Sequence, residues 1–146
     1  MDRKVVLLVE DNPDDRDLTL RAFERHRFGN EVVVAEDGQA ALDYLLAPAD
    51  GGRPRPLPEL VLLDLKLPKV DGLEVLRRIR AEERTRLLPV VVLTSSAEES
   101  DLVRSYALGA NGYVQKPVSF TDFVEASRHL GMYWLVLNRS PPRDDA

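Results

Sequence analysis

Short apolar runs alternate with longer amphipathic segments along the 146-residue chain. Three runs, at 5–9, 60–63 and 90–93, are continuous and rich in β-branched residues, and two weaker runs lie at 32–35 and 112–115. Continuous apolar runs of this length are typical of strands buried on both faces of a parallel sheet. The pattern therefore predicts five strands, with the two weaker runs at the edges of the sheet.

The segments between these runs have helical patterns. The clearest places apolar residues on one helix face, at Leu102, Val103, Tyr106, Ala107 and Ala110. The last helix shows the same spacing at Phe120, Phe123, Val124, Ser127 and Leu130. Asn12 and Pro13 supply a helix cap and a first-turn proline. Strands that alternate with helices form right-handed βαβ units, so we expect an α/β three-layer sandwich.

Composition and charge narrow the class of protein. The chain has no cysteine and two histidines, which argues against disulfides, thiolate metal sites and a zinc cage. Its formal charge of −5 gives no support for a nucleic-acid partner. The longest apolar run, at 132–137, is too short to span a membrane. We therefore expect a cytoplasmic domain with no nucleic-acid or membrane partner.

Two segments do not have a regular pattern. Residues 48–58 contain four prolines and two glycines, and they join the second helix to the third strand. We expect this loop at the amino-terminal edge of the strands. The polar, proline-containing end of the chain cannot form a core. We therefore expect one domain over residues 1–138 and a mobile tail over 139–146.

Charged and hydroxyl side chains follow four of the five runs. Glu10 and Asp11 end the first run, Asp64 ends the third, Thr94 ends the fourth and Lys116 follows the fifth. The carboxyl ends of parallel strands lie at one edge of the sheet, where open α/β sheets bind their ligands. These side chains are therefore expected to converge.

Three converging carboxylates repel one another unless a cation lies among them. Oxygen ligands with room for water suit Mg²⁺. With Lys116 and Thr94 beside the ion, the site suits a phosphoryl group. The chain has no serine or cysteine paired with a histidine base, so a carboxylate is the natural nucleophile, and Asp64 on a central strand is the best placed.

These residues and their order resemble the receiver domain of two-component response regulators, over roughly residues 4–130. Five motifs match in sequence: Glu10–Asp11 the metal-binding pair, Asp64 in 62–68 the phosphoacceptor, Thr94–Ser95 the switch hydroxyl and its small neighbour, Tyr113 the switch aromatic, and Lys116–Pro117 the lysine and the proline with a cis peptide bond. The resemblance implies a flavodoxin-like fold, with five helices and a five-stranded parallel sheet of order 2-1-3-4-5.

The resemblance also implies a mechanism. Asp64 takes a phosphoryl group from a phosphohistidine of a sensor histidine kinase. Asp11, Asp64 and the backbone carbonyl of Lys66 bind Mg²⁺, with Glu10 acting through water. Thr94 then moves toward the phosphoryl group and Tyr113 rotates inward. These movements shift the surface formed by the fourth helix and the fifth strand from one of its two conformations to the other. Such a protein is a phosphoacceptor switch, not an enzyme.

A narrower resemblance is to the stand-alone regulators of bacterial phytochrome kinases. It rests on the loop at 48–58 and on the string at 133–142. It implies a phytochrome-type kinase as partner and signalling through contact with an unknown downstream protein. The run at 132–137 is apolar on more than one helical face, which favours a homodimer through the C-terminal helix. Cover by the tail or by the 48–58 loop is the alternative.

Other interpretations remain open beside this one. A receiver-like module that is no longer phosphorylated is one, although the intact Glu10, Asp11, Asp64, Thr94 and Lys116 argue against it. A phosphatase with an aspartyl nucleophile is another, but Lys66 occupies the position where haloacid-dehalogenase enzymes have a second aspartate. Taken singly, the acidic pair also suits a solvated helix start, Thr94 a helix cap and Tyr113 an edge strand.

Overall fold

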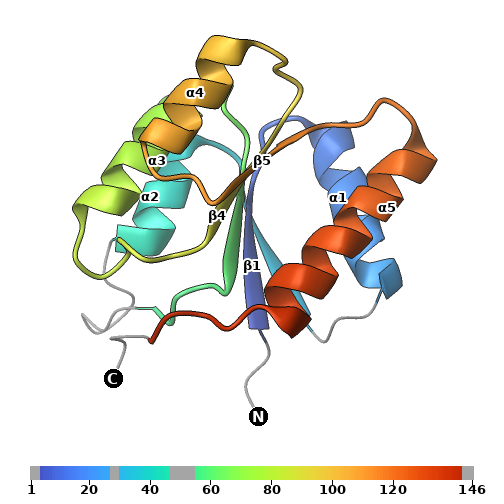
Figure 1. Ribbon diagram of the computed structural model, residues 1–146, viewed down its shortest axis with the longest axis horizontal. Coiled ribbons are helices and arrows are strands. Elements are labelled where there is room, and N and C mark those ends of the chain that lie inside the picture. Colours follow the sequence, from blue (N-terminus) through green and yellow to red (C-terminus); the bar gives the residue numbers. More distant parts are fainter. Residues whose placement is uncertain (1–3, 27–29, 47–54, 143–146) are drawn as a thin grey trace.

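The computed structural model describes residues 4–26, 30–46 and 55–142, and its centre is a five-stranded sheet (Figure 1). The strands are β1 (Lys4–Val9), β2 (Asn30–Ala35), β3 (Leu60–Leu63), β4 (Val90–Thr94) and β5 (Gly112–Gln115). All neighbours pair in parallel, in the order β2-β1-β3-β4-β5. The predicted order is confirmed, and the two weaker runs form the edge strands β2 and β5.

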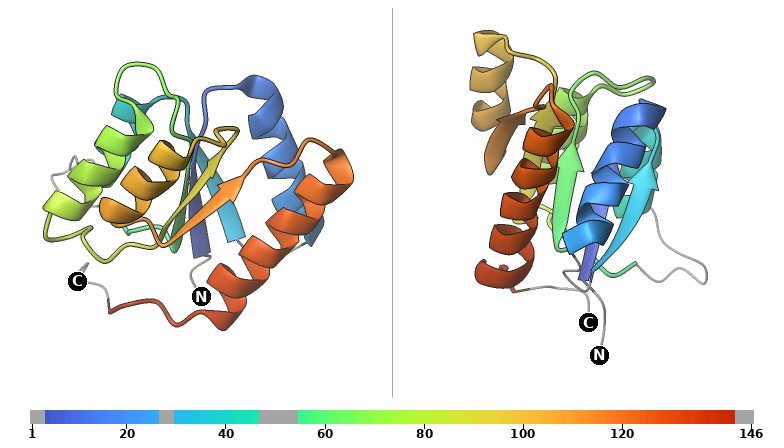
Figure 2. Two further views of the ribbon diagram at one scale, coloured as in Figure 1. Left: turned by 45° about the horizontal axis from the view of Figure 1, so that its top comes forward. Right: turned by 90° about the vertical axis from the view of Figure 1, so that its right-hand side faces the viewer.

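Helices cover both faces of the sheet, which gives the predicted three layers (Figures 1 and 2). The helices α1 and α5 lie on one face, and α2, α3 and α4 lie on the other. Their bounds are α1 (Pro13–His26), α2 (Gly38–Leu46), α3 (Gly72–Ala81), α4 (Glu99–Ala107) and α5 (Phe120–Gly131). A π-helical segment, η2 (Met132–Leu137), continues α5. None of the helices in the described ranges is long and apolar enough to cross a membrane.

The continuous apolar runs are explained by the two separate cores. In β1, Leu7 and Val9 pack into the core shared with α2 and α3, whereas Val6 and Leu8 pack on the other face with Phe23 of α1. Successive residues of a strand point to opposite faces, so a strand covered on both sides needs apolar residues at every position. The two cores thus hold the sheet between the helix layers, and the parallel sheet brings the carboxyl ends of its strands to one edge.

Local contacts fix the helices that flank that edge. The Asn12 side chain accepts hydrogen bonds from the backbone N of Asp14 and Asp15, at 2.9 and 3.0 Å, and starts α1. At the start of α3, a Cβ on Gly72 would lie 2.2 Å from the carbonyl oxygen of Asp64. Only glycine allows the backbone of α3 to approach the end of β3 this closely.

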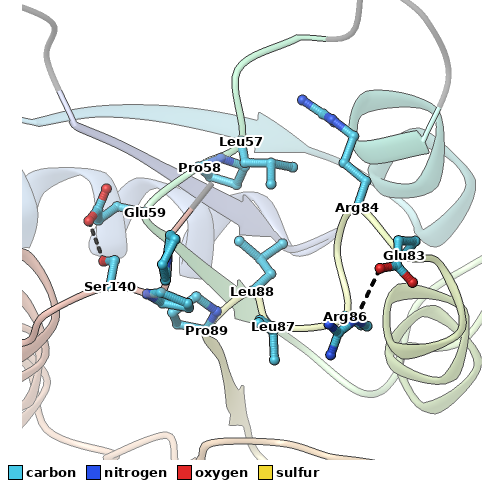
Figure 3. Close-up of a pocket in the computed structure, with 12 residues that line it drawn as sticks. Leu57, Pro58, Glu59, Glu83, Arg84, Arg86, Leu87, Leu88, Pro89 and Ser140 are labelled. Carbon is cyan, nitrogen blue, oxygen red and sulfur yellow. Dashed lines mark hydrogen bonds and ion pairs between the residues drawn. The ribbon is translucent and has the colours of Figure 1, made fainter. Parts of the chain in front are cut away.

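The C-terminal segment crosses the opposite, amino-terminal edge of the sheet. The Lys4 ammonium donates to the carbonyl of Leu135, and the Ser140 hydroxyl donates to the carboxylate of Glu59. A cavity of about 140 Å³ lies there, between Ser140–Pro142 and the residues that precede β3 and β4. Figure 3 shows the residues that line it. Of the predicted mobile tail, 139–142 have no regular structure and 143–146 lie outside the described residues. Of the predicted loop, 48–54 lie outside them, and 55–58 are irregular at the expected edge.

Candidate functional site

The ammonium group of Lys116 lies at the centre of the site at the carboxyl edge. Lys116 follows β5, and its Nζ lies 2.6 Å from Oε1 of Glu10 and 3.2 Å from Oδ2 of Asp64. It also lies 2.8 Å from Oδ2 of Asp15, in the first turn of α1. Glu10 follows β1 and Asp64 follows β3. Three strand ends and one helix therefore meet at one cation.

Three of the carboxylates also form a set that fits a metal ion. Glu10, Asp11 and Asp64 each offer an oxygen, and these oxygens lie within 4.8 Å of one another. Glu10 and Asp64 are buried, whereas Asp11 is exposed, so the set is open to solvent on one side. Carboxylate oxygens with an open side that admits water are the ligand set that Mg²⁺ prefers.

The pKa of Glu10 is raised by its burial and by the neighbouring negative charge. Burial raises the pKa of Glu10 from 4.5 to about 7, and the nearby negative charge of Asp64 adds to the increase, against the opposing hydrogen bond from Lys116. Burial alone would lower the pKa of Lys116, but its hydrogen bonds to Asp15 and Glu10 raise it above its usual value. Lys116 therefore stays charged, and Glu10 titrates near neutral pH.

The site has more negative than positive charge. Glu10, Asp11, Asp15 and Asp64 supply four carboxylates against the single ammonium of Lys116, which leaves −3 when all are ionised. A divalent cation would offset most of this charge. An open cavity of about 400 Å³ adjoins the set and is lined by eight residues besides Asp11, namely Leu65, Lys66, Leu67, Pro68, Asp71, Leu73, Glu98 and Asp101. The arrangement can therefore hold a hard cation and admit a phosphoryl donor.

The predicted switch residues lie beside this site, around Ser96. Thr94 is fully buried at the end of β4, and its Oγ1 accepts a hydrogen bond of 3.4 Å from the backbone N of Ser96. The hydroxyl of Tyr113 in β5 donates to the carbonyl of Ser96 at 3.0 Å. The Ser96 hydroxyl donates to Asp101 of α4 at 2.6 Å. Tyr113 is half-buried, and its hydrogen bond to Ser96 connects it to the loop that follows Thr94.

One prediction about the backbone is wrong. No peptide bond among the described residues is cis, so the bond between Lys116 and Pro117 is trans. The trans form of a bond before proline is favoured by about 0.5–1 kcal/mol. In this conformation Lys116 donates from its backbone N to the carbonyl of Thr94, at 2.7 Å, while its ammonium reaches the carboxylates.

Sequence reasoning missed three residues of the site. It gave no role in the site to Asp15, which lies in the first turn of α1, close in sequence to the acidic pair Glu10 and Asp11. It also gave no role to Ser96 or Asp101, whose contact depends on how α4 packs. The backbone N of Lys66 donates to Oδ1 of Asp64 at 3.4 Å.

Comparison with known proteins shows what this arrangement is similar to. Residues 6–128 match the family model of the response regulator receiver domain. Among curated proteins, the probable methanogenesis regulatory protein FilR2 of Methanothrix harundinacea (strain 6Ac) is 50% identical over 137 residues. The match covers 94% of this chain and 87% of that protein.

Two solved structures are similar along most of the chain. The phosphorylated cyanobacterial phytochrome response regulator RcpA has a TM-score of 0.89 and 35% identity, covering 97% of this chain and 100% of its own. The bacteriophytochrome response regulator RtBRR has a TM-score of 0.74 and 54% identity, covering 97% of this chain and 86% of its own. The expected similarity to phytochrome response regulators is confirmed.

Proposed function

The chain belongs to the response-regulator receiver family, and from this premise we propose that it accepts a phosphoryl group on Asp64 from a histidine kinase, in a reaction that requires Mg²⁺. Proteins of this family act as phosphoacceptor switches and are not classical enzymes. One observation carries the proposal: the buried carboxylate of Asp64 lies 3.2 Å from the ammonium of Lys116, beside the acidic set and the open cavity.

The positions of Asp64 and Lys116 support the following phosphoryl-transfer step. A carboxylate oxygen of Asp64 attacks the phosphorus of a phosphohistidine, the P–N bond breaks, and an acyl phosphate forms on Asp64. The electron pair of the broken bond stays on the imidazole nitrogen of the donor. Lys116 donates a hydrogen bond to a phosphoryl oxygen, and this charge-assisted bond stabilises the charge that remains on the phosphoryl group.

Receiver domains bind Mg²⁺ or Mn²⁺ in this acidic site. In this chain Asp11, Asp64 and the backbone carbonyl of Lys66 would hold the ion, with Glu10 acting through water. The bound ion supplies a positive charge that offsets the repulsion between the carboxylates and the incoming phosphoryl oxygens. The direct test of the ligands is Mg²⁺ affinity, which should fall in Asp11→Asn and remain in Asp17→Asn, an exposed carboxylate on α1.

The phosphoacceptor is identified by mass. The protein is incubated with acetyl phosphate, with Mg²⁺ or with EDTA, and intact mass is measured before and after hydroxylamine. We expect a hydroxylamine-labile phosphoryl adduct that needs Mg²⁺, disappears in Asp64→Asn and persists in Asp17→Asn. An adduct on another residue would contradict the proposal. No adduct with any donor would instead support the receiver-like module that is not phosphorylated.

The relatives support a proposal for the partner. Receivers of phytochrome response regulators interact with histidine kinases, and we propose that a phytochrome-type kinase is the donor here. Phosphotransfer is measured from a purified phytochrome kinase and from an unrelated histidine kinase at equal levels of autophosphorylation. Faster transfer from the phytochrome kinase is the expected result. Equal rates would remove the support for this pairing and leave the phosphoacceptor role untouched.

We propose that the signal passes through protein contact, including a homodimer formed through η2. Tyr133, Val136 and Leu137 all lie in η2, and each is more than half exposed. Light scattering should show a dimer that Val136→Asp dissociates, whereas Val118→Asp, an exposed apolar position outside this segment, should leave it intact. A monomer at high concentration, with or without phosphorylation, would reject the dimer.

A further inference from the structure

Asp15 is held rigidly at the rim of the phosphoacceptor site. Its backbone N donates to the Asn12 side chain at 3.0 Å, and its carbonyl accepts from the buried hydroxyl of Thr19 at 2.9 Å. The first turn of α1 thus fixes the backbone of Asp15, and its side chain, which is 34% exposed, places a carboxylate oxygen 2.8 Å from the ammonium of Lys116. Its neighbour Asp14 is exposed and has no ion pair within the part of the chain that the structure describes.

The ammonium of Lys116 has no spare donor in this arrangement. An ammonium group carries three N–H donors, and Lys116 has three carboxylate acceptors, on Glu10, Asp15 and Asp64. Its bond to Asp64 is the longest, at 3.2 Å, against 2.6 and 2.8 Å for the other two. A phosphoryl group on Asp64 therefore has to compete with Glu10 and Asp15 for the charge of Lys116.

We propose that Asp15 is a positioning residue that restrains phosphorylation: it occupies one N–H of Lys116 and adds a negative charge where the phosphoryl group must approach. This inference rests on the proposed function and adds a regulatory residue to it. Glu10 also contacts Lys116, at the shorter distance, so Lys116 remains oriented when Asp15 is neutralised. The net effect of Asp15 is then electrostatic, and its removal favours the anionic phosphoryl group.

The test compares the rate of phosphorylation by acetyl phosphate and Mg²⁺ in four proteins: the wild type, Asp15→Asn, Asp15→Glu and Asp14→Asn. Asp14→Asn is the matched control, because it removes the same charge from the adjacent residue of the same helical turn. We expect Asp15→Asn to react about two- to fivefold faster than the wild type, since a partly exposed ion pair has a modest effect. Asp14→Asn and Asp15→Glu are expected to stay within about twofold of the wild type.

Salt separates this role from a structural one. Raising salt from about 0.05 to about 0.5 M shortens the range of charge interactions, so the gain in Asp15→Asn should shrink. A gain that does not depend on salt, an unchanged rate or a slower rate would each overturn the inference. The thermal midpoint of each variant is measured alongside. If Asp15→Asn folds poorly, Asp15→Ser removes the same charge with another side chain and is expected to show the same faster rate.

The two proposals fail in different ways. If the wild type is not phosphorylated on Asp64, the proposed function itself is wrong. If the wild type is phosphorylated and Asp15→Asn behaves as Asp14→Asn does, only the role of Asp15 is overturned.

Discussion

The buried carboxyl of Glu10 predicts an unusual dependence of stability on pH. Glu10 is 2% exposed and has a pKa of about 7, raised mainly by burial. In the unfolded chain the group returns to its ordinary value of 4.5. One pKa unit corresponds to about 1.4 kcal/mol, so the difference amounts to about 3 kcal/mol in the free energy of unfolding.

The sign follows from which state binds the proton. Below pH 4.5 the carboxyl of Glu10 is protonated in both states, and its effect is absent. Between 4.5 and 7 the folded chain keeps a proton that the unfolded chain has lost, so stability falls as pH rises. Above about 7 the full penalty of about 3 kcal/mol applies.

The assay is urea unfolding in EDTA at a series of pH values from about 4.5 to about 8.5, a range that spans both pKa values. The wild type is compared with Glu10→Gln, which cannot titrate, and with Glu24→Gln, an exposed control on α1. The wild type should lose about 3 kcal/mol relative to Glu10→Gln across this range. Curves that stay parallel would show that Glu10 is not the buried, crowded carboxylate described above.

Three further predictions concern Lys66 after the phosphoacceptor, Arg80 at the opposite edge of the sheet, and Gly72 at the start of α3. Lys66→Ala changes the lifetime of the phosphorylated form, because it removes a positive, exposed side chain two residues after Asp64; an unchanged decay rate in a hydrolysis time course would contradict this. Arg80→Ala lowers the free energy of unfolding by about 2–3 kcal/mol in urea, because the Arg80 guanidinium donates to backbone carbonyls that precede β4 and β5. The control Arg77→Ala, which breaks an exposed ion pair with Glu74, changes that free energy by less than about 0.5 kcal/mol. Gly72→Ala costs about 1–3 kcal/mol in the same assay and slows phosphorylation, because its Cβ meets the end of β3; a neutral effect would contradict the close approach.

The sheet was predictable because burial on both faces leaves a strong signal. Every residue from Val6 to Val9 is buried, and so is all of β3 and β4. The edge strands have weaker runs because one side of each lacks a neighbouring strand, and their sequences still alternated with helices at the right spacing. The convergence of Glu10, Asp64 and Lys116 follows from the sheet alone, since each residue comes directly after a parallel strand.

The remaining features depend on packing between elements, which spacing along the chain does not determine. The contact between Asp15 and Lys116 needs the orientation of α1 about its axis, and the contact between Ser96 and Asp101 needs the angle of α4. The isomer of the bond before Pro117 is a balance of less than about 1 kcal/mol that sequence patterns do not resolve. The π-helical form of η2 likewise leaves no periodic signal that separates it from an ordinary helix end.

The proposed function requires that the acidic set at the carboxyl edge binds a divalent cation and thereby prepares Asp64 to carry a phosphoryl group. A crystal structure grown with Mg²⁺ and beryllium fluoride tests it most directly, because the fluoride complex imitates an acyl phosphate. We expect the metal against Asp11 and Asp64, the beryllium on a carboxylate oxygen of Asp64, and the Lys116 ammonium turned to a fluorine. Electron density with neither ion beside Asp64, in crystals where the side chain is accessible, would contradict it.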